Sequence, residues 1–297
     1  NDALQTIKEG EGKSVYPMQL AQGSTFNGFF NNYDGLASGL QPIGVKYDDA
    51  SRKVVCTLEQ DDIMDGLNWL HKWYQDGIIN PDANVVTDGG KGSIFGSAQG
   101  WPAAATTWAF NQGIEKYDLT QVFGPLYTTE TIQGSMNAIS ANSKYKTEAL
   151  KVLQLMNTDP KFRDMCAYGT EGNYMEYAED GTVQKLRDDW NWPSYTQGTF
   201  FILSTQADGD PDAWNQVKEQ NESATSSTCL GFALDVTNIQ NEVANCNAVW
   251  DKYKNDLLTG ASDPATAVPA CIEELKAAGL DTVIEEAQKQ VDEFFAN

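Results

Sequence analysis

The sequence predicts an α/β protein built as two lobes. Its 297 residues lie at the upper end of the roughly 250–300 residues at which a single hydrophobic core stops growing. Segments with helical periodicity alternate with short β-rich runs, which is the pattern of an α/β fold. A hydrophobic fraction of 41% supplies enough apolar side chains for two cores.

The first strong helical signal starts at Asp61 or Asp62, since either carboxylate can cap a helix. Gly77 and the following Asn80-Pro81 end it. The apolar face of this helix comprises Ile63, Met64, Leu67, Leu70 and Tyr74.

Five further helices follow. One runs from about Thr147 and is expected to bury Leu150, Leu153 and Met156. Asp159-Pro160 and Asp263-Pro264 each open a helix, because proline fits the first helical position. An apolar stripe from Ile239 to Leu257 ends at Gly260, and a last helix follows Gly279. Strands are predicted over residues 14–18, 53–58, 93–95, 135–139 and 200–203.

The charge and the apolar pattern exclude two classes of partner. A net charge of -22 repels nucleic acid and anionic membrane surfaces. The sequence has no run of about 18 apolar residues, so it predicts no membrane-spanning helix. The five cysteines form no Cys-x-x-Cys pair, which argues against a zinc or thioredoxin-like site.

The sequence also offers little support for catalysis. His71 is the one histidine and is predicted on a helix surface, so a Ser-His-Asp triad is disfavoured. A phosphate-binding loop motif is absent, and the acidic run Asp208–Asp212 lacks the glycine and glutamate of a calcium loop. We therefore predict no catalytic residue, metal or cofactor. A carboxylate pair for glycoside hydrolysis remains an open alternative, because sequence cannot give the distance between two acids.

Several runs resemble the family 1 extracellular solute-binding proteins, the maltose-binding-like group. They include the helix ending at Gly77-Ile78-Ile79-Asn80-Pro81, and Gly90–Phe95 followed by Gln99-Gly100-Trp101-Pro102. The remainder is similar to a subgroup with a C-terminal domain of unknown function. That similarity is carried by residues 168–174, 221–224, 230–232 and 275–281.

The resemblance implies a type II-like periplasmic-binding fold, helix-rich, with an incomplete first lobe. Family members begin with a signal peptide, a lipid-anchored cysteine and a βαβ half-lobe, and this sequence resembles the part that follows. We expect residues 1–125 to form the second lobe and residues 126–190 to return to the first. Residues 191–297 are expected to form a helical region that packs mainly on the second lobe.

The resemblance further implies a function. Such proteins capture a mono- or oligosaccharide by hinged closure and deliver it to membrane permease subunits of an ABC transporter. The implied protein is a monomer without a cofactor, lipid-anchored at the extracellular face of the membrane or periplasmic. A glycoside hydrolase or lyase, and a surface adhesion protein, remain as alternatives.

A sugar-binding site needs flat aromatic faces beside planar carboxylates or amides, because sugars present C–H faces and many hydroxyls. By the resemblance, Trp101 lies at a turn that reaches the cleft, and the Asn31–Asp34 stretch forms another cleft loop of the same lobe. Residues 171–174 would lie in a loop of the first lobe. The ligand-binding candidates are Phe26, Asn32, Tyr33, Asp34, Gln99, Trp101, Trp108, Glu171, Asn173, Tyr174, Trp190 and Trp192.

Cys246 and Cys271 are candidates for a disulfide. They lie on consecutive predicted helices joined around Gly260, at similar heights along the helix axes. Two buried free thiols are the alternative that the spacing leaves open.

We predict that Trp101 stacks on a sugar ring. Gly100 and Pro102 place it in a turn after a strand, a position suited to a cleft. Trp101→Ala should weaken sugar binding by about 1–3 kcal/mol, the range of stacking on nucleobases. It should lower stability less than the roughly 3–5 kcal/mol of a core tryptophan. Unchanged affinity in titration calorimetry would contradict the prediction.

Overall fold

The computed structural model describes residues 1–12, 14–89, 94–102, 104–105, 108–109, 114–115, 117–187, 189–190, 192, 194–207 and 209–296. The chain divides into two compact units. Unit 1 comprises residues 1–99, 127–130 and 226–297, and unit 2 comprises residues 100–126 and 131–225. These divisions differ from the predicted boundaries at residues 125 and 190. Strands β4 (Leu126–Tyr127) and β7 (Thr225–Ser226), which pair with each other, lie at two of the divisions.

Unit 1 contains a small antiparallel sheet of order β1-β2-β3. The strands are β1 (Tyr33–Asp34), β2 (Ile43–Lys46) and β3 (Val55–Cys56). Asp34 is opposite Val45, and Ile43 is opposite Cys56. Gly44 is needed at the first pairing, because a Cβ there would lie 2.9 Å from the Asp34 carbonyl oxygen.

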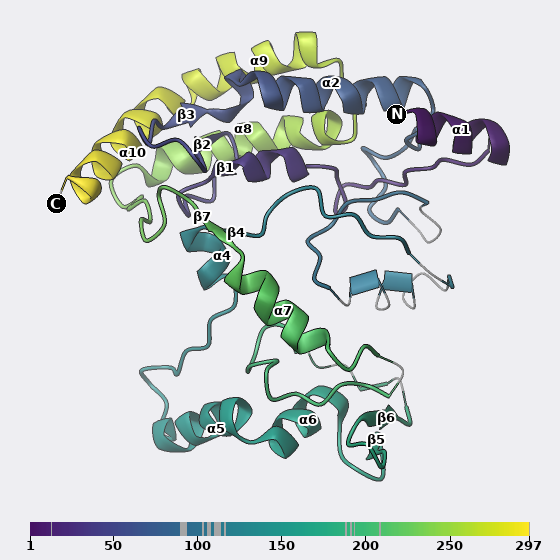
Figure 1. Cartoon of the computed structure of the whole chain (residues 1–297). Coiled ribbons are helices and arrows are strands. Elements are labelled where there is room, and N and C mark those ends of the chain that lie inside the picture. Colours follow the sequence, from purple (N-terminus) through teal and green to yellow (C-terminus); the bar gives the residue numbers. More distant parts are fainter. Residues whose placement is uncertain are drawn as a thin grey trace. The chain divides into compact units, whose positions relative to one another are not determined.

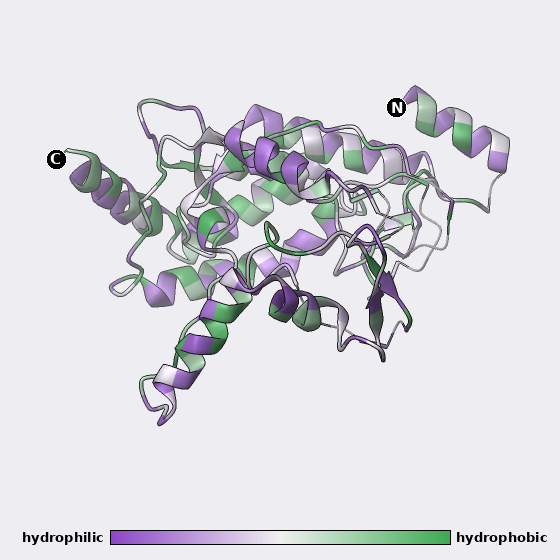
Figure 2. Cartoon of the chain, turned by 60° about the horizontal axis from the view of Figure 1, so that its bottom comes forward, coloured by the Kyte–Doolittle hydropathy of each residue, from purple (hydrophilic) through white to green (hydrophobic). Residues whose placement is uncertain are grey.

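Four long helices of unit 1 enclose a hydrophobic core with this sheet (Figure 1). They are α2 (Asp61–Gln75), α8 (Gln240–Leu258), α9 (Pro264–Ala277) and α10 (Leu280–Phe295). Figure 2 shows both hydrophilic and hydrophobic residues along α10, the helix beside the C-terminus, and its buried residues recur at helical spacing. Shorter helical elements of unit 1 are α1 (Asp2–Glu11), η1 (Gly28–Asn32) and η2 (Thr57–Glu59), and α4 (Thr129–Gln133) spans one of the divisions between the units.

The predicted helix boundaries are largely confirmed. The Asp263 side chain accepts a hydrogen bond from the Ala265 amide at 2.9 Å, and Asp159 accepts one from the Phe162 amide at 3.0 Å. Gly279 has φ +109°, in the left-handed region that glycine tolerates best. The predicted cap of α2 at Asp61 or Asp62 is corrected by the structure. The helix begins at Asp61, so both aspartates lie in its first turn, where their negative charges interact favourably with the helix dipole.

Most strand predictions were wrong. Residues 14–18, 135–139 and 200–203 form no strand, and only Val55–Cys56 of the 53–58 run does. Ser93, in the predicted strand 93–95, lies outside the described residues. The strands that do form have two to four residues, which is too short for an alternating hydrophobic signal.

Among the described residues of unit 2, three longer helices and a hairpin stand out. The helices are α5 (Lys146–Thr158), α6 (Pro160–Tyr168) and α7 (Ala213–Glu222). Strands β5 (Met175–Tyr177) and β6 (Val183–Lys185) form the antiparallel hairpin. Its apolar core comprises Tyr168, Met175, Val183 and Leu203. Along α5, Met156 is buried as predicted, but Leu150 is 59% exposed, so the predicted buried face is wrong at the start of this helix.

Two adjacent charges on α6 are buried in unit 2. Arg163 donates hydrogen bonds to the carbonyl oxygens of Thr199 and Ser194, each at 2.9 Å. Asp164 accepts from the Ser204 amide at 2.9 Å, the Ser204 hydroxyl at 2.8 Å and the Tyr177 hydroxyl at 2.9 Å. Burial lowers the pKa of Arg163, and Asp164 is among the groups that oppose this shift. The network therefore ties residues 194–204 to α6 and the hairpin.

The disulfide between Cys246 and Cys271 does not form in the structure, where both thiols are free and buried. Helices α8 and α9 do pack together as predicted. However, the Cys246 sulfur lies 3.7 Å from the Leu275 carbonyl oxygen, to which its thiol donates. The spacing gave the correct helix pair, but the direction of each side chain depends on packing.

The described helices of this protein include none with the length and apolar character of a membrane span.

Thiol counting tests this correction. Burial raises the pKa of Cys56 and Cys246 to about 11 and that of Cys271 to about 12, so their reactive thiolates are scarce at pH 8. We expect Ellman's reagent to label only half-buried Cys166 rapidly in the native protein. Denaturation without reductant should release all five cysteines, whereas a count of three would reveal a disulfide.

Gly260 is expected to be essential for the packing of α8 in unit 1. Its φ is +79°, and an added Cβ would lie 2.3 Å from the Leu70 carbonyl oxygen of α2. Gly260→Ala should therefore lower the free energy of unfolding by about 2–4 kcal/mol, through backbone strain and overpacking. Gly10→Ala is the matched control, because no atom lies within 4 Å of its added Cβ. Urea denaturation of both variants checks the difference.

Candidate functional site

The predicted residues Asn32 and Tyr33 of unit 1 bind to Asp62 on α2. The Tyr33 hydroxyl donates to Asp62 Oδ1 at 2.8 Å, and Asn32 Nδ2 donates to Asp62 Oδ2 at 3.2 Å. Burial and the Asp62 carboxylate raise the pKa of Tyr33, so its hydroxyl remains a donor. These hydrogen bonds join β1 to α2. They use the Asn32 amide and the Tyr33 hydroxyl, which were predicted to contact a ligand.

Asp34 and Phe26 both contact other residues of unit 1. Asp34 is 1% exposed, and its Oδ1 accepts from the Leu36 amide at 2.9 Å within the turn after β1. Phe26 packs edge-to-face on Trp73, with ring centroids 6.1 Å apart, beside a core cluster of unit 1. The Asp34 side chain therefore stabilises the turn in which it lies, and Phe26 packs against the core.

Trp101 and Trp108 lie together in unit 2, as an edge-to-face pair with ring centroids 5.9 Å apart. Both are half-buried. A Cβ on Gly100 would approach the Trp108 ring to 3.3 Å, so the small residue permits this packing. Gln99 is exposed and ends the first segment of unit 1. Residues 90–93 of the family-like motif lie outside the described residues.

The hairpin of unit 2 brings together a second set, the Tyr174 cluster: Asn173, Tyr174, Arg187, Asp189 and Trp190. Tyr174 directly precedes β5, and its carbonyl oxygen accepts from the Leu186 amide, just after β6, at 2.9 Å. Pairing of the two strands thus places residues that are distant in the sequence beside one another. Three of the five, Asn173, Tyr174 and Trp190, were predicted from the sequence.

Trp190 has a fixed position in the cluster. Its ring centroid lies 5.3 Å from that of Tyr174, and its indole Nε1 donates to the Cys166 carbonyl oxygen of α6 at 3.0 Å. The Arg187 guanidinium lies over the Tyr174 ring, 4.8 Å from its centroid. Because Arg187 covers a Tyr174 face, Trp190 is the aromatic better placed to stack on a ligand.

Arg187 and Asp189 add planar polar groups that the sequence analysis missed. Arg187 Nε donates to Asp189 Oδ1 at 2.9 Å, and its Nη2 donates to Asp189 Oδ2. Arg187 Nη1 also lies 3.5 Å from Asn173 Oδ1. The hydrogen-bonded ion pair raises the pKa of Arg187 and lowers that of Asp189. Only the hairpin register could have identified these residues.

The other predicted residues of unit 2 lie near this hairpin in sequence. Glu171 is exposed and forms an isolated β-bridge with Met175. Trp192 is half-buried, and its indole nitrogen has no hydrogen-bond partner within the described part of the chain. Among the described residues, no hydrogen bond or ring contact joins either of them to Tyr174 or Trp190.

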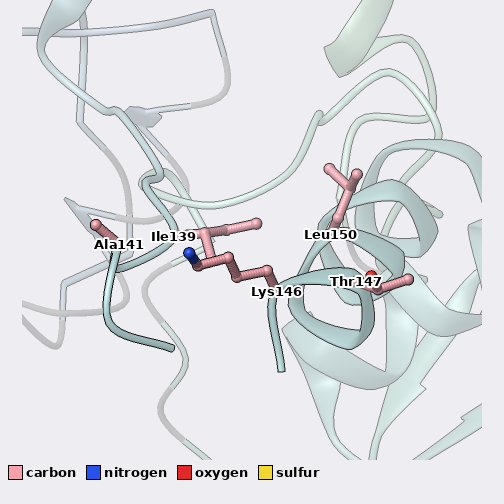
Figure 3. Close-up of a pocket in the computed structure, with 5 residues that line it drawn as sticks. All are labelled: Ile139, Ala141, Lys146, Thr147 and Leu150. Carbon is pink, nitrogen blue, oxygen red and sulfur yellow. The ribbon is translucent and has the colours of Figure 1, made fainter. Parts of the chain in front are cut away.

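A separate hollow lies at the start of α5, with a volume of about 370 Å³ (Figure 3). It is lined by Ile139, Ala141, Lys146, Thr147 and Leu150, none of which was predicted as a ligand contact. Its lining has no aromatic side chain and one cation, so it does not favour a sugar.

Among the described residues, no group of three or more His, Cys, Asp or Glu side chains is arranged to hold a metal ion.

The Arg187–Asp189 pair predicts a pH dependence. Because Arg187 holds the pKa of Asp189 below its usual value, the pair is complete above that usual value and is lost as pH falls through the lowered pKa. In Arg187→Gln, the pKa of Asp189 should return toward about 3.9. Carboxyl NMR titration measures this shift. Lys218→Gln, which removes an exposed cation of α7, should leave it unchanged.

Comparisons with known proteins agree with the predicted resemblance. Residues 228–296 match the family described as "Domain of unknown function (DUF3502)". A carbohydrate ABC transporter substrate-binding protein of Streptococcus pneumoniae serotype 4 (strain ATCC BAA-334 / TIGR4) is 27% identical over 283 residues. That alignment covers 90% of this chain but 57% of the relative, so the chain spans little more than half of its length.

Solved structures show the same relationship. The crystal structure of the N-glycan transport solute-binding protein NgtS from Streptococcus pneumoniae matches with a TM-score of 0.86 and 24% identity, over 100% of this chain and 67% of that one. Its complex with Man1GlcNAc matches with a TM-score of 0.81 and 25% identity, over 99% and 67%. The fold class is thereby confirmed as that of two-lobe solute-binding proteins, and the chain resembles carbohydrate-binding members that serve ABC transporters.

Proposed function

We propose that this protein captures a carbohydrate for an ABC importer. The observation that carries the proposal is the match of nearly the whole chain to the Man1GlcNAc complex of NgtS at a TM-score of 0.81. The relative from Streptococcus pneumoniae, a carbohydrate ABC transporter substrate-binding protein, supports the same function. An N-glycan fragment is accordingly the first ligand to test.

The Tyr174 cluster is the ligand surface that we propose on unit 2. Trp190 would stack on the C–H face of a sugar ring, since its indole is held by Cys166 and lies beside Tyr174. The Asn173 and Asp189 oxygens can accept hydrogen bonds from sugar hydroxyls, and Arg187 can donate to them. Trp101 and Trp108 form the second aromatic pair of this unit and remain candidates for a further sugar contact.

We further propose that the protein binds its ligand without altering it. The relatives are solute-binding proteins, and the polar side chains of the Tyr174 cluster include a single carboxylate, that of Asp189. Glycoside hydrolysis generally requires two carboxyl groups about 5–10 Å apart. Glycan that is recovered unchanged after incubation would support this proposal, whereas turnover would favour the enzyme alternative.

The remaining parts of the proposal concern partners and location. The captured sugar would pass to permease subunits in the membrane, and the protein would act as a monomer at the extracellular face or in the periplasm. The relative's role as the substrate-binding protein of an ABC transporter supports this arrangement. An adhesion protein would instead show no stabilisation by small glycans.

A glycan panel tests the function. Thermal shift and titration calorimetry with Man1GlcNAc, larger mannose-containing glycans and other oligosaccharides should give a stabilising ligand, worth about 2.7 kcal/mol at 100 times Kd. Trp190→Ala should weaken that binding by about 1–3 kcal/mol. The control Trp69→Ala removes a tryptophan of α2 that is 46% exposed, and should leave affinity unchanged. Equal effects of the two variants would contradict the assignment of Trp190.

A further inference from the structure

The one cation of the Tyr174 cluster already has a carboxylate partner within the protein. Two nitrogens of Arg187, Nε and Nη2, donate to the two oxygens of Asp189. The third, Nη1, is directed to the Asn173 amide oxygen at 3.5 Å, and the guanidinium lies over the Tyr174 ring. This is the bidentate geometry in which arginine recognises a carboxylate. A ligand carboxylate would therefore compete with Asp189 for the same donors.

The charge around the cluster adds to this effect. Residues 164–190 carry seven Asp and Glu side chains but only two Lys and Arg, in a chain of net charge -22. Lys185, the other cation, lies on β6 opposite Met175. Arg163 just before this segment is fully buried and donates to backbone carbonyl oxygens. An approaching anion thus meets a negative field.

A neutral sugar meets no such obstacle. Its hydroxyls can donate to the Asp189 and Asn173 oxygens without displacing the ion pair, because each carboxylate oxygen has lone pairs for more than one donor. Its apolar face can lie against Trp190, whose indole is fixed by Cys166. The same surface therefore suits a neutral ring and disfavours one that carries a carboxylate.

We propose that the Tyr174 cluster selects neutral oligosaccharides over acidic ones, with Asp189 acting as a built-in competitor for Arg187. This specificity rests on the proposed carbohydrate function and names the ligand class of the same site. Uronate- and sialate-bearing glycans are the acidic class that it disfavours.

The first experiment compares Man1GlcNAc with its C6-oxidised, uronate form by titration calorimetry on the intact protein. We expect the uronate form to bind about tenfold more weakly, a difference of roughly 1.4 kcal/mol, at low ionic strength. The difference should shrink at about 0.5 M salt, where screening shortens the range of the charge. Equal or tighter binding of the uronate form overturns the inference while leaving the proposed function intact.

The second experiment removes the Asp189 carboxylate that pairs with Arg187. Asp189→Asn should increase affinity for the uronate form about tenfold, as expected for charge-assisted hydrogen bonds, and change affinity for Man1GlcNAc little. Glu176→Gln is the matched control, because it removes one exposed negative charge from the same hairpin and keeps the Arg187–Asp189 pair.

The outcomes separate the two proposals. If only Asp189→Asn increases the affinity for the uronate form, the result supports the role of Asp189 as a competitor. An equal gain in Glu176→Gln, or no gain in either variant, overturns it. Failure of both glycans and of the whole oligosaccharide panel to bind overturns the carbohydrate function and the inference together.

Discussion

Unit 2 depends on the buried neighbours Arg163 and Asp164. Its apolar core is formed by a small set of side chains around Tyr168 and Met175, so polar contacts hold much of its irregular backbone. Arg163 fixes residues 194–199 through two carbonyl oxygens, and Asp164 joins Ser204 to Tyr177 of the hairpin. Loss of the hydrogen-bond partners of either residue would leave a buried charge without compensation, which is costly in a protein interior.

The same helix controls the candidate site. Helix α6 supplies the Cys166 carbonyl oxygen that holds Trp190, and Asp164 on α6 binds Tyr177 at the end of β5. The aromatic pair of the Tyr174 cluster is therefore placed by a helix whose buried charges join it to residues 194–204 and to the hairpin. This arrangement gives rigid support to side chains that remain exposed for binding.

Unit 1 is organised differently. Its larger core is an apolar cluster between four long helices and a short sheet, and the polar residues near β1 bind one another. Tyr33 and Asn32 both donate hydrogen bonds to Asp62 at the start of α2. Side chains that would suit a sugar when considered singly are thus used to stabilise the fold, because their nearest partners lie within the protein.

The sequence by itself determined the long helices of this protein and its resemblance to sugar-binding proteins. Capping aspartates before Pro160 and Pro264, glycines at 260 and 279, and apolar residues at helical spacing are local signals, and each was sufficient to place a helix boundary. Its motifs resembled those of a carbohydrate-binding family, and this resemblance led to Asn173, Tyr174 and Trp190 as candidates.

The tertiary structure alone decided which of the candidates lie together. Arg187 and Asp189 join Tyr174 only because β5 and β6 pair in one register, and two- to four-residue strands leave no readable period in the sequence. It also decided that Asp34 is buried and that Cys246 and Cys271 remain free thiols. Burial and side-chain direction depend on contacts between segments far apart in the chain, which local sequence patterns do not encode.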